Sequence, residues 1–252
     1  MKNEIAKLLL AIQLLTRIPV NTTTIFTDQR MASAPRYYPL VGTMIGAVAA
    51  TVYLLATTNL SEVIAVMLST TATLMLTGAF HEDGLADTFD GIGGGADADR
   101  ALEVMRDSRL GTYGSLALII VITLKMALLV DIPAGSVAAA LIAGHTLSRL
   151  SSVIVIVRSN YVRAEGTGKP VARGLSTRSW QIASLCGLIV LTGSWPWLHS
   201  EALFAGLLLL FMGHYVTRAW VEKNISGYTG DTLGAVQQTS ELCFYLGLSL
   251  CL

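Results

Sequence analysis

Long apolar stretches recur along almost the whole chain, and each is long enough to cross a lipid bilayer. They occupy residues 36–57, 62–80, 114–130, 134–157, 180–198, 201–221 and 233–252. A helix that crosses the hydrocarbon core needs about 20 predominantly apolar residues. Charged residues make up only 13% of the chain, against about 25% in soluble domains. The sequence therefore predicts an all-α, polytopic integral membrane protein with about six to seven transmembrane helices.

The N-terminal segment has a different character. Residues 4–20 are apolar overall but include Lys7, Gln13 and Arg17, which are costly inside a bilayer. We expect an amphipathic N-terminal helix that lies on the membrane surface or re-enters it. We treat residues 1–252 as a single membrane-embedded domain.

Lysine and arginine residues gather on one side of the predicted spans. They precede the first span and follow the second, fourth and sixth, whereas the loops near Asn59, Asp131 and His199 contain none. Basic residues in short loops are retained on the cytoplasmic side, so we expect the N-terminus and every loop that carries a motif to face the cytoplasm. The net charge is zero and no basic stripe is interleaved with aromatics, which argues against nucleic-acid binding.

The segment from His81 to Gly95 directly follows the second apolar stretch and contains four acids and five glycines. Asp83, Asp87 and Asp90 are spaced i, i+4 and i+7, so a helix would place them on one face. Like charges so close together repel, and oxygen ligands of this kind favour Mg²⁺ bound to a phosphate.

Two glycines of this segment, Gly84 and Gly91, would lie beside the acidic face. Without side chains they would let a bulky ligand approach the backbone. A solvated loop is the alternative interpretation of the whole segment.

Two further polar loops offer ligand-binding groups. Arg106 and Arg109 alternate with acids, which indicates either a clamp for a diphosphate or a solvated helix with ion pairs. Asp231 and Gln238 would share a helix face and form a second half-site opposite the first acids, or serve only in interhelical hydrogen bonding. The loop after the fourth span, with Glu165, gives a weaker indication of ligand binding.

The pattern G-H-x-x-[ST]-R occurs twice, ending at Arg149 and at Arg218. Each arginine lies toward the cytoplasmic end of a predicted span, where it could reach an anionic ligand. The alternative is that both arginines extend to the lipid headgroups.

These motifs together resemble the cobalamin synthase family of bacterial vitamin B12 assembly, and the resemblance covers nearly the whole chain. It rests on the segments 16–20, 36–42, 81–91, 106–114 and 230–235, together with Gln238 and Glu241.

The resemblance implies a Mg²⁺-dependent phosphotransferase, an adenosylcobinamide-GDP ribazoletransferase, in the bacterial cytoplasmic (inner) membrane. Its substrates would be adenosylcobinamide-GDP and α-ribazole or α-ribazole 5′-phosphate, and GMP would be released. By position in the motif, the metal ligands would be Glu82, Asp83, Asp87 and Asp90, and the proton acceptor would be Asp90 or His81. The candidate substrate-binding residues are Arg106, Arg109, Arg149, Arg218, Asp231 and Gln238. A homo-oligomer is compatible with the sequence.

Two other functions fit parts of the pattern. CDP-alcohol phosphotransferases also place a D-G-x-x-A motif at a membrane edge, but here Asp87 replaces the arginine that follows the alanine in their motif. A transporter could use acids, histidines and arginines as a conduction path, but the acids of this chain are concentrated in loops.

Overall fold

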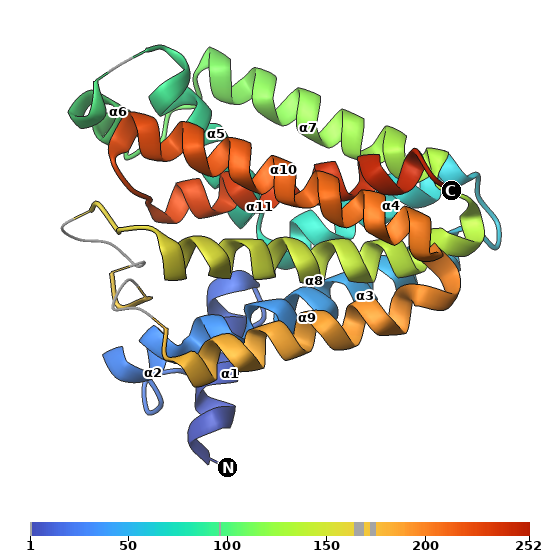
Figure 1. Ribbon diagram of the computed structural model, residues 1–252, viewed down its shortest axis with the longest axis horizontal. Coiled ribbons are helices and arrows are strands. Elements are labelled where there is room, and N and C mark those ends of the chain that lie inside the picture. Colours follow the sequence, from blue (N-terminus) through green and yellow to red (C-terminus); the bar gives the residue numbers. More distant parts are fainter. Residues whose placement is uncertain (1, 96, 164–168, 172–174) are drawn as a thin grey trace.

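The computed structural model is a bundle of helices (Figure 1). It describes residues 2–95, 97–163, 169–171 and 175–252, and Glu165 of the predicted ligand loop lies outside these ranges. No β-strand occurs in the described part of the chain. The helices are α1 (Lys2–Leu15), α2 (Asp28–Ser33), the 3-10 helix η1 (Ala34–Tyr37), α3 (Tyr38–Ala56), α4 (Glu62–Thr77), α5 (Phe80–Gly93), α6 (Ala98–Val104), α7 (Thr112–Asp131), α8 (Ala134–Arg158), α9 (Thr177–Leu198), α10 (Ser200–Ile225) and α11 (Gly230–Ser249).

Among the described residues, five helical segments are long and apolar enough to cross a membrane. They are Asp28–Ala56, which joins α2, η1 and α3, and the helices α7, α8, α9 and α10. Counting the bent pair of α4 and α5 as one span gives six. The predicted all-α membrane architecture is thereby confirmed. The predicted stretch 233–252 forms α11, which is too polar to count among them because it carries Gln237, Gln238 and Glu241.

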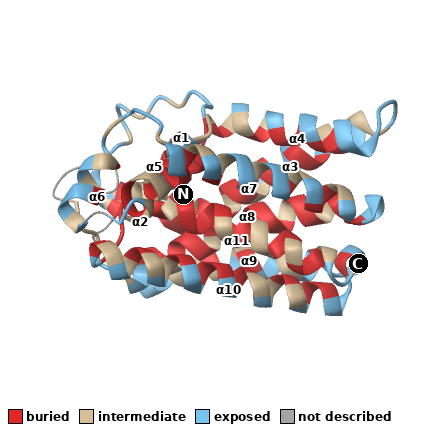
Figure 2. Ribbon diagram, turned by 90° about the horizontal axis from the view of Figure 1, so that it is seen from above, coloured by how far each residue is buried: buried red, intermediate tan, exposed pale blue. Residues whose placement is uncertain are grey.

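The middle of the bundle is formed by α8 and α11, which are largely buried (Figure 2). Of the most apolar part of α8, 78% is buried by the rest of the protein, against 22% for α9. The polar residues of α8 and α11 therefore meet other helices, whereas α9 presents most of its surface to its surroundings.

A sharp turn separates α4 from α5, whose axes differ by 85°. The chain turns at Gly78 and Ala79, which have φ values of 68° and 57° in the left-handed region where helices commonly end. The backbone N–H of Arg17 donates to the carbonyl of Leu76 at 2.7 Å, so the segment after α1 packs against this turn. The helix α5 consequently lies at one end of the bundle, beside α6 (Figures 1 and 2).

The predicted N-terminal helix forms α1. Its carboxylate Glu4 accepts hydrogen bonds from Lys7 Nζ at 2.7 Å, Arg36 Nη1 at 3.1 Å and the Tyr37 hydroxyl at 2.8 Å. Leu10 on the same helix is buried in the core. These contacts fix α1 against η1 at the start of the first span.

Candidate functional site

Two glycines allow α5 to approach α11 closely. A Cβ atom on Gly84 would stand 2.6 Å from the carbonyl oxygen of Asp231, and one on Gly234 would stand 2.8 Å from that of His81. Real Cβ atoms do not come so near other atoms, so any larger residue would force the helices apart. The helix α5, which carries the acids, therefore packs directly against the first turns of α11.

This packing corrects one expectation. The sequence predicts open space for a ligand at Gly84 and Gly91, but Gly84 faces α11, and Gly91 faces Ala101 and Met105 around the end of α6. A helix face without side chains is the face that a neighbouring helix can approach most closely, and here protein fills the space.

The seating of α5 on α11 brings carboxylates from two distant segments together. Burial, followed by the negative charges of Asp83 and Asp231, raises the pKa of Asp87 to about 7. Because the charges of Asp83 and Asp231 both act on Asp87, these carboxylates lie near enough to repel one another. Asp231 on α11 thus lies near the acids of α5, as expected if it forms the second half of one shared site.

An arginine without a predicted role borders these acids. Arg163 Nη2 pairs with Asp231 Oδ2 at 2.7 Å. The backbone before Arg163 is held by an isolated parallel bridge between Tyr161 and Tyr228, in which Tyr228 N donates to Asn160 O at 2.8 Å. The signal in the sequence is the basic loop after α8, but spacing cannot show which of its charges meets α11.

Arg106 lies near the same group. Burial raises the pKa of the Tyr161 hydroxyl, and the positive charges of Arg163 and Arg106 oppose this rise, whereas the charge of Asp231 adds to it. Acids of α5 and α11 and these two arginines therefore share one end of the bundle.

Asp90 ties α5 to the start of α7. Its two carboxylate oxygens accept hydrogen bonds from the backbone N–H groups of Gly111 at 2.7 Å and Gly114 at 2.8 Å. A Cβ atom on either glycine would collide with the Asp90 carboxylate. An acid at a helix N-terminus also interacts favourably with the helix dipole. This contact explains the G-x-x-G spacing, and the metal and proton-acceptor roles of Asp90 stay predictions.

Glu82 and His81 are both buried where α5 meets α11. Glu82 Oε1 accepts a hydrogen bond from Gln238 Nε2 at 2.9 Å, and its Oε2 has no partner among the described residues. Burial lowers the pKa of His81 well below its usual value, so its imidazole is neutral. Gln238 thus contacts a predicted metal ligand rather than an open surface.

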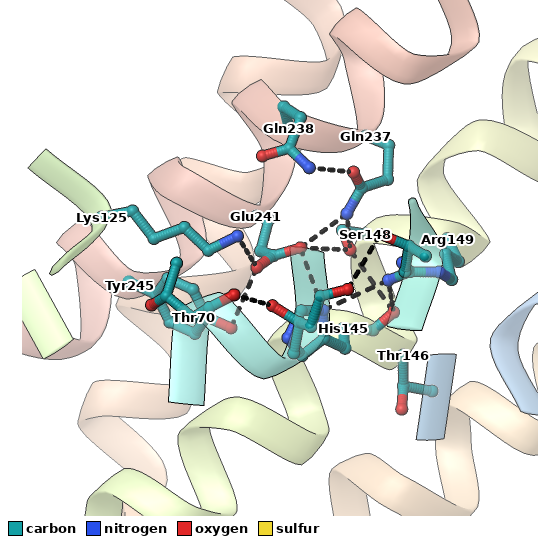
Figure 3. Close-up of polar contacts among 12 residues, drawn as sticks. Thr70, Lys125, His145, Thr146, Ser148, Arg149, Gln237, Gln238, Glu241 and Tyr245 are labelled. Atoms are coloured by element: carbon teal, nitrogen blue, oxygen red, sulfur yellow. Dashed lines mark hydrogen bonds and ion pairs between the residues drawn. The ribbon is translucent and has the colours of Figure 1, made fainter. Parts of the chain in front are cut away.

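A buried polar network continues from Gln238 toward the centre of the bundle (Figure 3). Glu241 is fully buried and pairs with Lys125 Nζ at 2.7 Å and with His145 Nδ1 at 3.3 Å. Gln237 Nε2 donates to Glu241 Oε2 at 2.6 Å. No role was predicted for Lys125, although it is the only charged residue in the stretch 114–130 and such residues commonly mark functional sites.

Arg149 belongs to this network. Its side chain is buried, its Nη1 donates to the carbonyl of His145 at 3.0 Å, and its Nε has no partner among the described residues. Arg149 and His81 both line a cavity of about 50 Å³ that is otherwise mostly apolar. Its walls come from Leu14, Leu15, Tyr38, Phe80, Ser152, Val171, Tyr228, Gly230, Leu233 and Gly234.

The other predicted arginines occupy different surroundings. Arg218 Nε donates to Glu222 at 2.9 Å, and its Nη2 donates to the carbonyl of Arg158 at 3.3 Å. Arg109 is exposed and pairs with Asp107. The two copies of G-H-x-x-[ST]-R therefore place their arginines differently, one in the buried network and one at the bundle surface.

The negative charge of the acid cluster favours a bound metal ion, but the side chains are not arranged around one. Among the residues that the structure describes, no three His, Cys, Asp or Glu side chains converge closely enough to hold one. Asp83, Asp87 and Asp231 nevertheless repel one another, and their hard oxygen atoms are the donors that Mg²⁺ prefers. The donor chemistry therefore suits Mg²⁺.

These features define a polytopic membrane protein with a charged site at one end of a helical bundle. The family model for cobalamin-5-phosphate synthase matches residues 7–249. The chain therefore belongs to the cobalamin-5-phosphate synthase family.

Individual relatives agree with this match. An adenosylcobinamide-GDP ribazoletransferase from Shewanella frigidimarina is 43% identical over 242 residues, covering 94% of this chain and 91% of the relative. Proteins of the same name from Vibrio cholerae and Ralstonia pickettii are each 40% identical, and the alignments cover 98% and 94% of this chain and 94% and 93% of the relatives. No solved structure matches the chain. The comparisons give no support to a CDP-alcohol phosphotransferase or a transporter.

Proposed function

We propose that this protein is an adenosylcobinamide-GDP ribazoletransferase. A hydroxyl oxygen of α-ribazole, or of its 5′-phosphate, bonds to the phosphorus that carries the cobinamide. The bond from that phosphorus to the GMP oxygen breaks, giving cobalamin or its 5′-phosphate and free GMP. The proton of the hydroxyl passes to a basic group of the protein. The observation that carries the proposal is the packing of the acidic helix α5 on the start of α11, beside Arg163, in a chain of this family.

We propose Mg²⁺ as the cofactor, held by Asp83 and Asp87 together with Asp231, and with Glu82 and Asp90 as further candidates from the motif. The metal would neutralise charge on the diphosphate and on the leaving GMP. The unpartnered Oε2 of Glu82 and the crowded charge around Asp87 support this donor set.

The arginines would bind the anionic parts of the nucleotide substrate. Arg163 pairs with Asp231, and Arg106 lies near Tyr161, two residues before Arg163. A guanidinium at either position can form paired hydrogen bonds to a phosphate. Arg109 is close to Arg106 in sequence, and its side chain is exposed although it pairs with Asp107. Arg149 and Arg218 are weaker candidates because Arg149 is buried in the network around Glu241 and Arg218 is held by Glu222 and the carbonyl of Arg158.

His81 is the better placed of the two predicted proton acceptors. Its side chain lines a cavity, whereas both Asp90 oxygens already accept backbone hydrogen bonds.

The orientation follows from the basic residues. The end of the bundle that holds α5 and α6 also holds the loop with Arg163, and positive loops are retained in the cytoplasm. We therefore propose a protein of the bacterial inner membrane with its site open to the cytoplasm.

The test is GMP release by the purified protein in detergent. Release should require adenosylcobinamide-GDP, α-ribazole and Mg²⁺ together, and Asp87→Asn should abolish it while the protein stays folded by circular dichroism. GMP release without α-ribazole, or no release with all three present, would contradict the reaction. Full activity of Asp87→Asn would remove that residue from the proposed metal site without affecting the assignment of the reaction.

A further inference from the structure

A large groove opens on the outer surface of the bundle, away from the acid site. It has a volume of about 590 Å³, within the range of about 300–1,000 Å³ of small-molecule sites. In Figure 1, α9 and α10 are joined at the right and diverge toward the left, with α8 between them. The groove is lined by Leu150, Ile154, Val157, Arg158, Trp180, Ser184 and Phe211.

The helices that form the rim face hydrocarbon. Both α9 and α10 can cross the membrane, and their outer faces expose large apolar side chains next to the groove. Leu185, Leu188 and Met212 are each more than half exposed, and Tyr215 is 72% exposed. In a bilayer these surfaces are in contact with lipid chains, so an apolar groove between them is accessible to the same chains.

One end of the groove is basic. Arg158 is the last residue of α8 and is exposed. Its side chain forms no ion pair with any residue that the structure describes, whereas the neighbouring Arg218, which donates to the Arg158 carbonyl, is paired with Glu222. Trp180 lies in the first turn of α9 at this end, and tryptophan is enriched at the level of the lipid headgroups.

We propose that this groove binds an acidic glycerophospholipid of the surrounding membrane. One acyl chain lies along Leu150, Ile154 and Phe211, and the headgroup phosphate pairs with Arg158. A guanidinium that no described carboxylate neutralises, at the cytoplasmic end of an apolar groove, matches an anionic headgroup above a hydrocarbon chain. None of the acids of α5 and α11 lines this groove, and the proposal does not depend on the reaction.

The test uses the full-length protein in vesicles that contain phosphatidylglycerol and phosphatidylcholine with identical acyl chains. After extraction in mild detergent, native mass spectrometry counts the lipids that stay bound. The wild type should retain phosphatidylglycerol about fivefold over phosphatidylcholine, the factor expected for one arginine near an anionic lipid. Arg158→Gln should abolish this preference, and Ser184→Leu, which fills the groove, should reduce retention of both lipids.

The matched control is Arg100→Gln, which removes an exposed arginine of α6 that is paired with Glu103 and should leave the preference unchanged. Equal preference in Arg158→Gln and the wild type, or undiminished retention in Ser184→Leu, would overturn the proposal. A phosphatidylglycerol with a photoreactive acyl chain tests the site in the unmodified protein. Labelling should fall on α8, α9 and α10 near Ile154, Trp180 and Phe211, and labelling confined to other helices would contradict it.

Discussion

Lys125 on α7 and Glu241 on α11 form an ion pair of 2.7 Å in which the carboxylate is fully buried. The two residues are 116 positions apart, and the pair joins two helices in the interior of the bundle. Such a pair is costly to bury, but removing one member leaves the other charge without compensation.

Removal of both members of this pair should therefore cost less than the sum of the two single removals. We expect Lys125→Met or Glu241→Gln to lower the free energy of unfolding by about 3–5 kcal/mol, and the double variant to cost about 1–3 kcal/mol less than the sum. Thermal unfolding in detergent measures all three. Lys223→Met, an exposed lysine of α10, should change stability by less than about 0.5 kcal/mol. Strict additivity would show that the two charges do not interact.

Asp87 should make Mg²⁺ binding depend on pH. The proton that Asp87 holds below pH about 7 competes with the metal. The apparent Mg²⁺ dissociation constant should therefore rise about tenfold for each pH unit below 7. Titrations of GMP release with Mg²⁺ at several pH values measure it. A constant affinity between pH 6 and 8 would be inconsistent with Asp87 as a ligand.

The same carboxyl group has the opposite effect on the protein without metal. Its folded-state pKa of about 7 lies above the ordinary value of 3.8, so its contribution to stability is present below pH 3.8 and is lost as the pH rises through 7. The metal-free protein should thus melt at a higher temperature at pH 6 than at pH 8. Asp87→Asn should remove that part of the difference, and added Mg²⁺ should restore stability at pH 8.

The close approach of α5 and α11 can be tested at Gly84. Gly84→Ala places a methyl group 2.6 Å from the Asp231 carbonyl oxygen, and we expect it to cost about 1–3 kcal/mol of stability by overpacking and to reduce turnover. Gly135→Ala on α8 is the matched change, since nothing lies within 4 Å of its added carbon, and it should be neutral or stabilising. Equal effects of the two substitutions would argue against tight packing at Gly84.

Asp90 should contribute to stability through α7. Asp90→Ala removes two hydrogen bonds to the first turn of that helix, and a loss of about 1–2 kcal/mol is expected from the cap alone. Thermal unfolding measures the loss, and faster hydrogen exchange near Gly114 would locate it. Unchanged protection of the start of α7 would indicate that Asp90 acts elsewhere.

Arg106 should affect substrate binding. Arg106→Ala is expected to raise the KM for adenosylcobinamide-GDP about tenfold, equivalent to about 1.4 kcal/mol of binding, with a smaller change in kcat. Arg100→Ala on the same side of the acids, where the arginine is paired with Glu103, serves as the comparison. Steady-state kinetics of GMP release distinguish them, and equal KM values would exclude Arg106 from the nucleotide site.

Much of the fold was predictable because apolar length and helical spacing are local properties. The spacing of Asp83, Asp87 and Asp90 predicted the helix that forms α5, and the long apolar stretches predicted the spanning helices. The polar residues Asp231 and Gln238 of α11 predicted either a half-site or interhelical hydrogen bonding, although the segment was also counted as a span. Its buried polar groups contact α5, α7 and α8, and no local sequence pattern shows which helices these are.

Most residues of the site could be predicted from the sequence, but their contacts could not. Periodicity shows which residues share a helix face, not which helix that face meets. Gly84 was therefore assigned to a ligand although it meets Asp231, and Arg163 was overlooked although it pairs with the same residue. Glu241, the partner of Lys125, lies on a segment far away in the sequence, and the spacing of residues within one segment carries no information about such a contact.

The turn of 85° between α4 and α5 has a consequence for access from water. Asp83 and Asp90 are separated by seven residues, which is about 10 Å along a helix axis. A helix continuing straight from α4 would distribute its acids over that range of membrane depth, where polarity changes steeply. Because α5 turns aside, its acids share nearly one depth, so a water-soluble substrate could meet all of them without entering the hydrocarbon.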